Sequence, residues 1–86
     1  MFDIIYFGAS WCAPCKQMKV MLNDLMKKHN IDIVFYDIEQ NYEQAVRYGI
    51  TTVPTLIKVD FNFDELERIE GARPKYELEK FIKELV

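Results

Sequence analysis

Two cysteines, Cys12 and Cys15, are the residues with the clearest chemical potential, and they are the only cysteines in the chain. Thiols separated by two residues can alternate between a dithiol and a disulfide, because the second sulfur reaches back across one helical turn. A bond closing so short a loop removes little chain entropy and therefore adds little stability. The pair indicates redox chemistry, in which one cysteine attacks a disulfide and the other resolves the intermediate.

The surrounding sequence predicts a strand, a loop and a helix that together position this pair. Residues 2–7 form an apolar run, typical of a central strand buried on both faces. From Ala13 to about His29, apolar residues recur at helical spacing, and Pro14 suits a first helical turn. Cys12 would then face unpaired amide hydrogens and the positive end of the helix dipole, which lowers the pKa of its thiol.

The rest of the chain completes an α/β pattern. The sequence predicts a strand at residues 31–37, a short helix from Tyr42 to Tyr48 stopped by Gly49, strands at residues 55–60 and 65–70, and a last helix opened by Pro74 with Leu78, Phe81, Ile82 and Leu85 on one face. The resulting order, β-α-β-α-β-β-α, predicts a four-stranded mixed sheet flanked by helices. It leaves no length for a linker, so we expect one domain over residues 1–86.

The composition and charge of the chain make some classes of function and partner unexpected. The 86 residues are 50% hydrophobic, carry a net charge of -3 and contain no basic cluster, so nucleic acid is not an expected partner. No apolar run approaches the roughly 18 residues of a membrane span, and the N-terminus does not resemble a secretory leader. We expect a soluble, cytoplasmic monomer that needs no cofactor and no metal.

The segment Trp11-Cys12-Ala13-Pro14-Cys15-Lys16 follows a buried strand, and Gly49-Ile50 and Val53-Pro54-Thr55 come later. Together these segments resemble the thioredoxin family. The resemblance covers nearly the whole chain, without the strand and helix that usually precede the first central strand. It implies a thioredoxin-like fold and an enzyme that reduces protein disulfides, with Cys12 as nucleophile and Cys15 as resolving residue. A separate reductase of the thioredoxin-reductase type would restore the dithiol.

The residues around the pair are expected to meet the substrate. Trp11 would contribute apolar contact surface, Ala13 would leave Cys12 accessible, and Pro14 would stiffen the turn. By resemblance, Pro54 would be a cis-proline that sits against the cysteines, the Val53 backbone would pair with an extended substrate strand, and Gly71 would let a partner approach.

The sequence departs from the family pattern at Tyr6 and Phe35. Thioredoxins usually have a buried aspartate six residues before the first cysteine and a lysine on the next strand, and these two residues stand there instead. The usual proton acceptor for the resolving cysteine is therefore absent. The sequence identifies no other residue that would accept the proton of the resolving cysteine.

Three other readings stay open. A glutaredoxin-like enzyme that uses glutathione fits the short chain, although Ala9 and Ser10 stand where a basic residue would bind a glutathione carboxylate. Two chains could share a zinc ion through their cysteine pairs. The protein could also be a binding module that does not need its thiols. His29 and the acids Glu65, Glu67, Glu70, Glu77 and Glu79 are expected to be solvent-facing.

Overall fold

The computed structural model describes residues 3–84. The elements in chain order are β1 (Ile4–Gly8), α1 (Ala13–His29), β2 (Ile33–Asp37), α2 (Tyr42–Arg47), β3 (Thr55–Val59), β4 (Glu65–Glu70) and α3 (Lys75–Lys83). The strands form one four-stranded sheet in the order β2-β1-β3-β4. β1 pairs with β2 in parallel, whereas β3 pairs antiparallel with both β1 and β4. The predicted element order and mixed sheet are thus confirmed.

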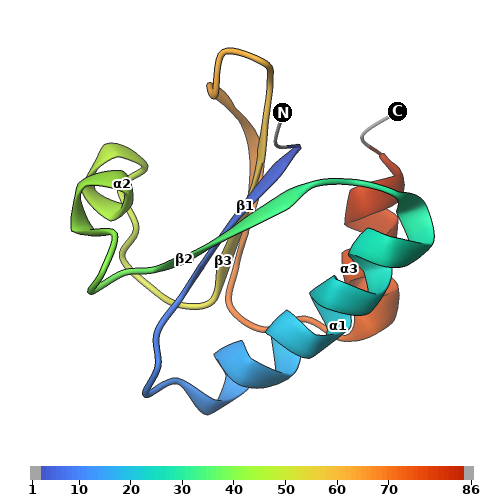
Figure 1. Ribbon diagram of the computed structural model, residues 1–86, viewed down its shortest axis with the longest axis horizontal. Helices are drawn as coiled ribbons and strands as arrows, with labels where there is room; N and C mark the ends of the chain where they lie inside the picture. Colours follow the sequence, from blue (N-terminus) through green and yellow to red (C-terminus); the bar gives the residue numbers. More distant parts are fainter. Residues whose placement is uncertain (1–2, 85–86) are drawn as a thin grey trace.

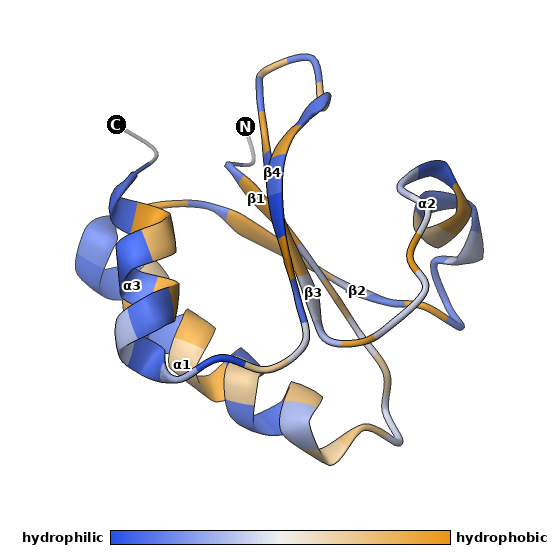
Figure 2. Cartoon of the chain, turned by 180° about the vertical axis from the view of Figure 1, so that it is seen from behind, coloured by the Kyte–Doolittle hydropathy of each residue, from blue (hydrophilic) through white to orange (hydrophobic). Residues whose placement is uncertain are grey.

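Helices cover both faces of the sheet. α1 and α3 lie side by side on one face, and α2 lies on the other (Figure 1). Every residue of β1 is buried, because side chains at alternate positions point into different layers of the core. Tyr6 packs in the layer under α1 and α3, and Phe7 packs in the layer under α2. Figure 2 shows the hydrophobic residues of β1 and β3 at the centre of the molecule.

Local sequence signals set both ends of α1. Cys12 is the N-cap and Pro14 lies in the first turn, where a missing amide hydrogen costs no intrahelical bond. Asn30 is the C-cap with φ 52°, a left-handed conformation that asparagine tolerates, and its N–H bonds back to the Met26 carbonyl. The predicted helix bounds, Ala13 and His29, are confirmed.

Other predicted bounds shift by one or two residues. β2 begins at Ile33 rather than residue 31, α2 ends at Arg47, and β3 ends at Val59. Pro74 is the N-cap of α3 and not its first helical residue. Two predicted members, Phe2 in the first strand and Leu85 in the last helix, lie outside the described residues.

The expectation of a solvent-facing His29 is wrong. Its Nε2 atom lies 2.7 Å from Glu79 Oε2, and the side chain is only 21% exposed. Because α1 and α3 pack side by side, the end of α1 lies against an acidic residue of α3, which partly shields His29 from solvent. Glu79 is likewise an ion-pair partner and not a simply solvated acid.

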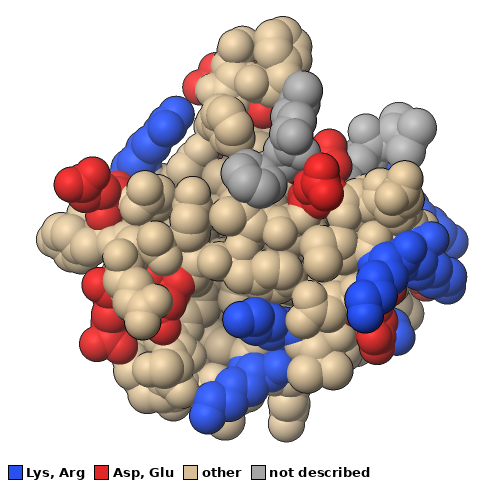
Figure 3. Space-filling model, viewed as in Figure 1, with Lys and Arg blue, Asp and Glu red and all other residues tan. Residues whose placement is uncertain are grey.

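None of the helices in residues 3–84 has the length and hydropathy needed to cross a membrane. Lys and Arg side chains gather most densely over α1 in the view of Figure 3, and acidic side chains lie on the opposite side of that view, over α2 and the segment that joins it to β2.

Candidate active site

A disulfide joins Cys12 and Cys15 at the start of α1, and their Cα atoms are 5.2 Å apart. The Cys15 backbone N–H donates to Cys12 Sγ over 3.2 Å. This donor and the positive end of the α1 dipole favour negative charge at that sulfur. The helix start therefore suits a thiolate at Cys12 once the disulfide is reduced.

The two sulfur-bearing residues differ in exposure. Cys12 is 7% exposed and Cys15 is 3% exposed, so Cys12 is the easier of the two to approach, although only a small part of it is visible. Ala13 and Pro14 lie on the surface beside it. Trp11 is 67% exposed, which is unusual for a large aromatic side chain. All three residues therefore lie on the surface beside the pair.

An apolar groove begins at the Trp11 side chain. It has a volume of about 290 Å³, and its lining residues are Trp11, Ile38, Ile50, Thr51, Thr52 and Val53. The Val53–Pro54 peptide bond is cis, as the resemblance implies. Val53 also packs against the core cluster that contains both cysteines. The groove thus places a run of backbone next to the redox pair.

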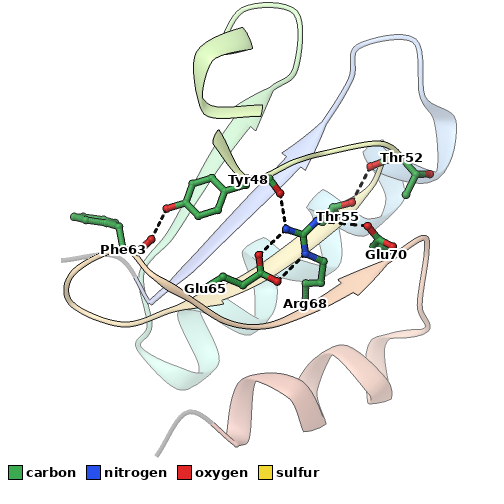
Figure 4. A network of polar contacts seen from close by, with 7 residues as sticks. All are labelled: Tyr48, Thr52, Thr55, Phe63, Glu65, Arg68 and Glu70. Atoms are coloured by element: carbon green, nitrogen blue, oxygen red, sulfur yellow. Dashed lines mark hydrogen bonds and ion pairs between the residues drawn. The ribbon is translucent and has the colours of Figure 1, made fainter. Parts of the chain in front are cut away.

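Polar contacts hold the segment that lines this groove. At one end Arg68 of β4 donates to the Tyr48 carbonyl, while Glu65 and Glu70 pair with its guanidinium (Figure 4). At the other end the Thr55 hydroxyl donates to the Thr52 carbonyl over 2.7 Å. The Gly71 N–H donates to the carbonyl of Pro54 over 2.8 Å. The groove wall is therefore fixed on both sides.

The backbone conformation at position 71 favours glycine. Its φ is +92°, a region that L side chains rarely adopt. Its bond to Pro54 brings it to the edge of the groove segment. Gly71 thus lies one hydrogen bond away from the cis-proline, and its role in letting a partner approach stays a prediction.

Tyr6 lies directly beneath the redox pair. It is 3% exposed, and its hydroxyl donates to the Cys15 carbonyl over 2.7 Å. Burial raises the pKa of Tyr6 to about 12, so the phenol keeps its proton at neutral pH. Its ring packs against Phe35, with centroids 5.4 Å apart, and the Lys19 ammonium lies 5.3 Å from the Phe35 centroid.

A second cavity, of about 330 Å³, opens beside Cys15. Tyr6 and Phe35 line its inner part, and polar side chains that include Lys16, Lys19 and Asp37 line the rest. Lys16 and Lys19 are exposed, so the cavity communicates with solvent. Cys15 is one of the residues that line this cavity, although only 3% of its surface is exposed.

The family model described as Thioredoxin matches residues 2–84. The chain belongs to the thioredoxin family. Thioredoxin H2 of Arabidopsis thaliana is 35% identical over 95% of this chain, which spans 61% of that protein's length. Thioredoxin of Listeria monocytogenes is 32% identical over 93% of this chain and 79% of its own length. A thioredoxin structure from Schistosoma mansoni has a TM-score of 0.87 and 28% identity, covering 99% of this chain and 81% of that one.

Membership of the thioredoxin family and the Cys12–Cys15 pair together support thiol–disulfide oxidoreductase function. The fold is thioredoxin-like: a four-stranded mixed sheet flanked by helices. Relatives named thioredoxin also support the class of protein-disulfide reductases.

The structure gathers the residues predicted from the thioredoxin resemblance but adds contacts that the sequence does not reveal. Ile38 and Ile50 complete the groove, and they lie in the segments that follow β2 and α2. Tyr6 is identified in the sequence only as a departure from the family, and its bond to Cys15 is new. The sequence places Tyr6 in a strand predicted to be fully buried, two residues before Gly8. A buried hydroxyl needs a hydrogen-bond partner, so this position could have indicated such a contact.

Proposed function

We propose that this protein reduces disulfide bonds in other proteins, with Cys12 as the nucleophile and Cys15 as the resolving residue. The observation that carries this assignment is the position of Cys12 at the helix N-cap, where its sulfur accepts the Cys15 N–H and is the less buried of the pair. The Cys12 thiolate attacks a substrate disulfide and forms a mixed disulfide, and one substrate sulfur leaves as a thiolate. Cys15 then attacks Cys12 Sγ, which releases the second substrate sulfur and forms the Cys12–Cys15 disulfide.

The groove would hold the substrate during both steps. Thr52 and Val53 bring backbone to its wall, and an extended peptide can pair with exposed backbone groups as an added strand. Trp11 supplies an exposed apolar surface at its end. The substrates expected are therefore proteins with an accessible disulfide in an extended segment.

Each catalytic cycle leaves the protein oxidised, so two electrons must be returned by another protein. We propose a separate reductase of the thioredoxin-reductase type as the donor. The remaining parts of the proposal are a cytoplasmic monomer, a single domain over residues 1–86, and no nucleic-acid or membrane partner. Of these, the absence of a nucleic-acid partner is supported by the net charge of -3.

Insulin reduction with dithiothreitol as electron source tests the proposal. The wild type should accelerate insulin reduction, and Cys12→Ser should abolish the acceleration because the remaining thiol, Cys15, is the more buried of the two. Cys15→Ser, the matched control, should still attack but should accumulate a mixed disulfide visible by mass spectrometry. Acceleration by Cys12→Ser would show that the nucleophile is assigned wrongly. Activity only in a glutathione-coupled assay would favour a glutaredoxin-like enzyme, and inactivity in both assays would favour a binding module.

A further inference from the structure

The Tyr6 hydroxyl connects the central strand to the turn that carries Cys15. Its bond to the Cys15 carbonyl is 2.7 Å long and buried, and it joins residues nine positions apart in the chain. Most of the helix's backbone contacts come from neighbouring turns, whereas this one comes from the sheet. The first turn of α1 is thus fixed to a strand that is buried along its whole length.

We propose that Tyr6 is a positioning residue that holds Cys15 in place for its attack on the mixed disulfide at Cys12. The proposal rests on the resolving role of Cys15 in the proposed function. It assigns to Tyr6 a different task from that of the aspartate usual at this place, because a neutral hydroxyl donates a hydrogen bond and accepts no proton.

The mixed disulfide is the state in which such positioning matters. Cys12 is then bonded to the substrate and no covalent bond ties it to Cys15. The rate of closure depends on how much of the time Cys15 Sγ lies within reach of Cys12 Sγ, so a group that restrains the Cys15 backbone raises the effective concentration of its sulfur. The Tyr6 hydroxyl restrains the carbonyl of that same residue.

The proton of Cys15 leaves by another route. In the closing step the Cys15 thiol loses its proton, its sulfur bonds to Cys12 Sγ, and the Cys12–substrate bond breaks to release a thiolate. Because burial keeps Tyr6 protonated, Tyr6 cannot receive that proton. The proton leaves instead toward the cavity of about 330 Å³ that Cys15 helps to line. Positioning and proton removal are therefore performed by different features.

The two steps can be separated with Ellman's reagent, a small aromatic disulfide. Attack by Cys12 on the reagent releases one coloured thiolate and leaves the other half on Cys12, and closure by Cys15 then releases the second. Stopped-flow absorbance of the reduced protein reports both rates without any protein substrate. A failure of the wild type on insulin would thus count against the proposed function while this measurement still tests Tyr6.

The test compares wild type with Tyr6→Phe, which removes the hydroxyl and keeps the ring. Loss of one buried hydrogen bond should slow closure by about threefold to tenfold while attack keeps its rate. Tyr36→Phe is the matched control, because Tyr36 lines the same cavity from the neighbouring strand, and it should change neither rate. Wild-type closure in Tyr6→Phe would overturn the proposal. So would an equal change in both rates, which would indicate general loosening or unfolding.

Discussion

Tyr6 and Gly8 act together beneath the active-site turn. They are two residues apart in β1, so their side-chain positions lie on the same face of the strand. A Cβ added at Gly8 would lie 2.7 Å from the Tyr6 hydroxyl oxygen and 2.8 Å from its Cε1 atom. Gly8 is therefore required by the space that the Tyr6 ring occupies. A larger residue there would push the phenol away from Cys15.

Gly8→Ala should lower the free energy of unfolding by about 1–3 kcal/mol, the usual cost of overpacking a filled site. It should also slow the closure step, because the displaced ring loses its bond to the Cys15 carbonyl. Urea unfolding and the two-phase absorbance measurement check these effects.

Gly49→Ala is a control with a different physical cause. Gly49 has φ +60° and no atom within 4 Å of an added Cβ, so alanine there strains the backbone, at about 1 kcal/mol or more, without a clash. We expect it to lose stability and keep the wild-type closure rate.

In a Tyr6→Phe background, Gly8→Ala should cost less stability, since the hydrogen bond between the Tyr6 hydroxyl and the Cys15 carbonyl is already gone. Full stability in Gly8→Ala would contradict the steric account.

At the residue scale, features that depend only on neighbouring residues can be predicted from the sequence. The spacing of Cys12 and Cys15 and the N-cap position of Cys12 depend on neighbouring residues, so both follow from the sequence. The hydrogen-bond partner of Tyr6 does not follow from the sequence. The Tyr6 ring passes over Gly8, and its hydroxyl reaches a carbonyl that belongs to another element. A sequence comparison records only that an aspartate is missing.

At the scale of elements, β4 acts as a brace for the groove. Arg68 extends from β4 to the Tyr48 carbonyl at the end of α2, and two acids of its own strand hold the guanidinium (Figure 4). The Tyr48 hydroxyl in turn donates to the Phe63 carbonyl in the β3–β4 turn, over 2.7 Å. The start of the segment that lines the groove is thus tied to the hairpin at two points.

Arg68→Gln should free the Tyr48 carbonyl and lower the free energy of unfolding by about 1 kcal/mol, a modest value because the site is partly exposed. Backbone amides of residues 49–53 should exchange with deuterium faster, since one anchor of that segment is lost. Arg68→Lys should restore only part of the protection, because an ammonium cannot make the same forked contacts.

Arg47→Gln is the matched control for Arg68. Arg47 lies 5.4 Å from the centroid of the Tyr48 ring but on the exposed surface of α2. Its removal should leave exchange at residues 49–53 close to that of the wild type. Equal acceleration in the two variants would show that the charge near Tyr48, and not the contact with its carbonyl, stabilises the segment.

Element types follow from sequence more readily than element ends. α1 matches its predicted bounds because its caps are encoded by Cys12, Pro14 and Asn30. β2 begins later than predicted because pairing sets its start: Ile33 is opposite Ile4, where β1 begins, while the Asp32 backbone bonds to Asp3 instead. Tertiary pairing of this kind leaves no local signal.

At the scale of the whole molecule, charge links the two helices that cover one face of the sheet. Glu79 of α3 lies 2.8 Å from Lys28 and 2.7 Å from His29, at the end of α1. Lys75 at the start of α3 lies 3.5 Å from Asp24 of α1. Ion pairs thus join α1 to the first residue and to the middle of α3. These contacts supplement the shared apolar core between the helices.

The Glu79 pairs should make the fold sensitive to acid. Hydrogen bonds from Lys28 and then His29 hold the pKa of Glu79 at about 2, below its ordinary value of 4.5. A carboxyl with a lower pKa in the folded state contributes stability while it is ionised in both states. Its contribution is complete above about pH 4.5 and is lost as the pH falls toward 2. Glu79→Gln should remove it.

Urea unfolding of wild type and Glu79→Gln at several pH values tests this linkage. The wild type should be more stable near pH 7, and the difference should shrink as the pH falls from about 4.5 to about 2, because the protonated carboxyl resembles the amide. Glu77→Gln is the control: Glu77 pairs with Arg73, four residues earlier, so its loss cuts no contact between the helices. It should show a smaller difference at pH 7. A constant gap between wild type and Glu79→Gln across the whole pH range would mean that the residue stabilises the helices by packing and not by charge.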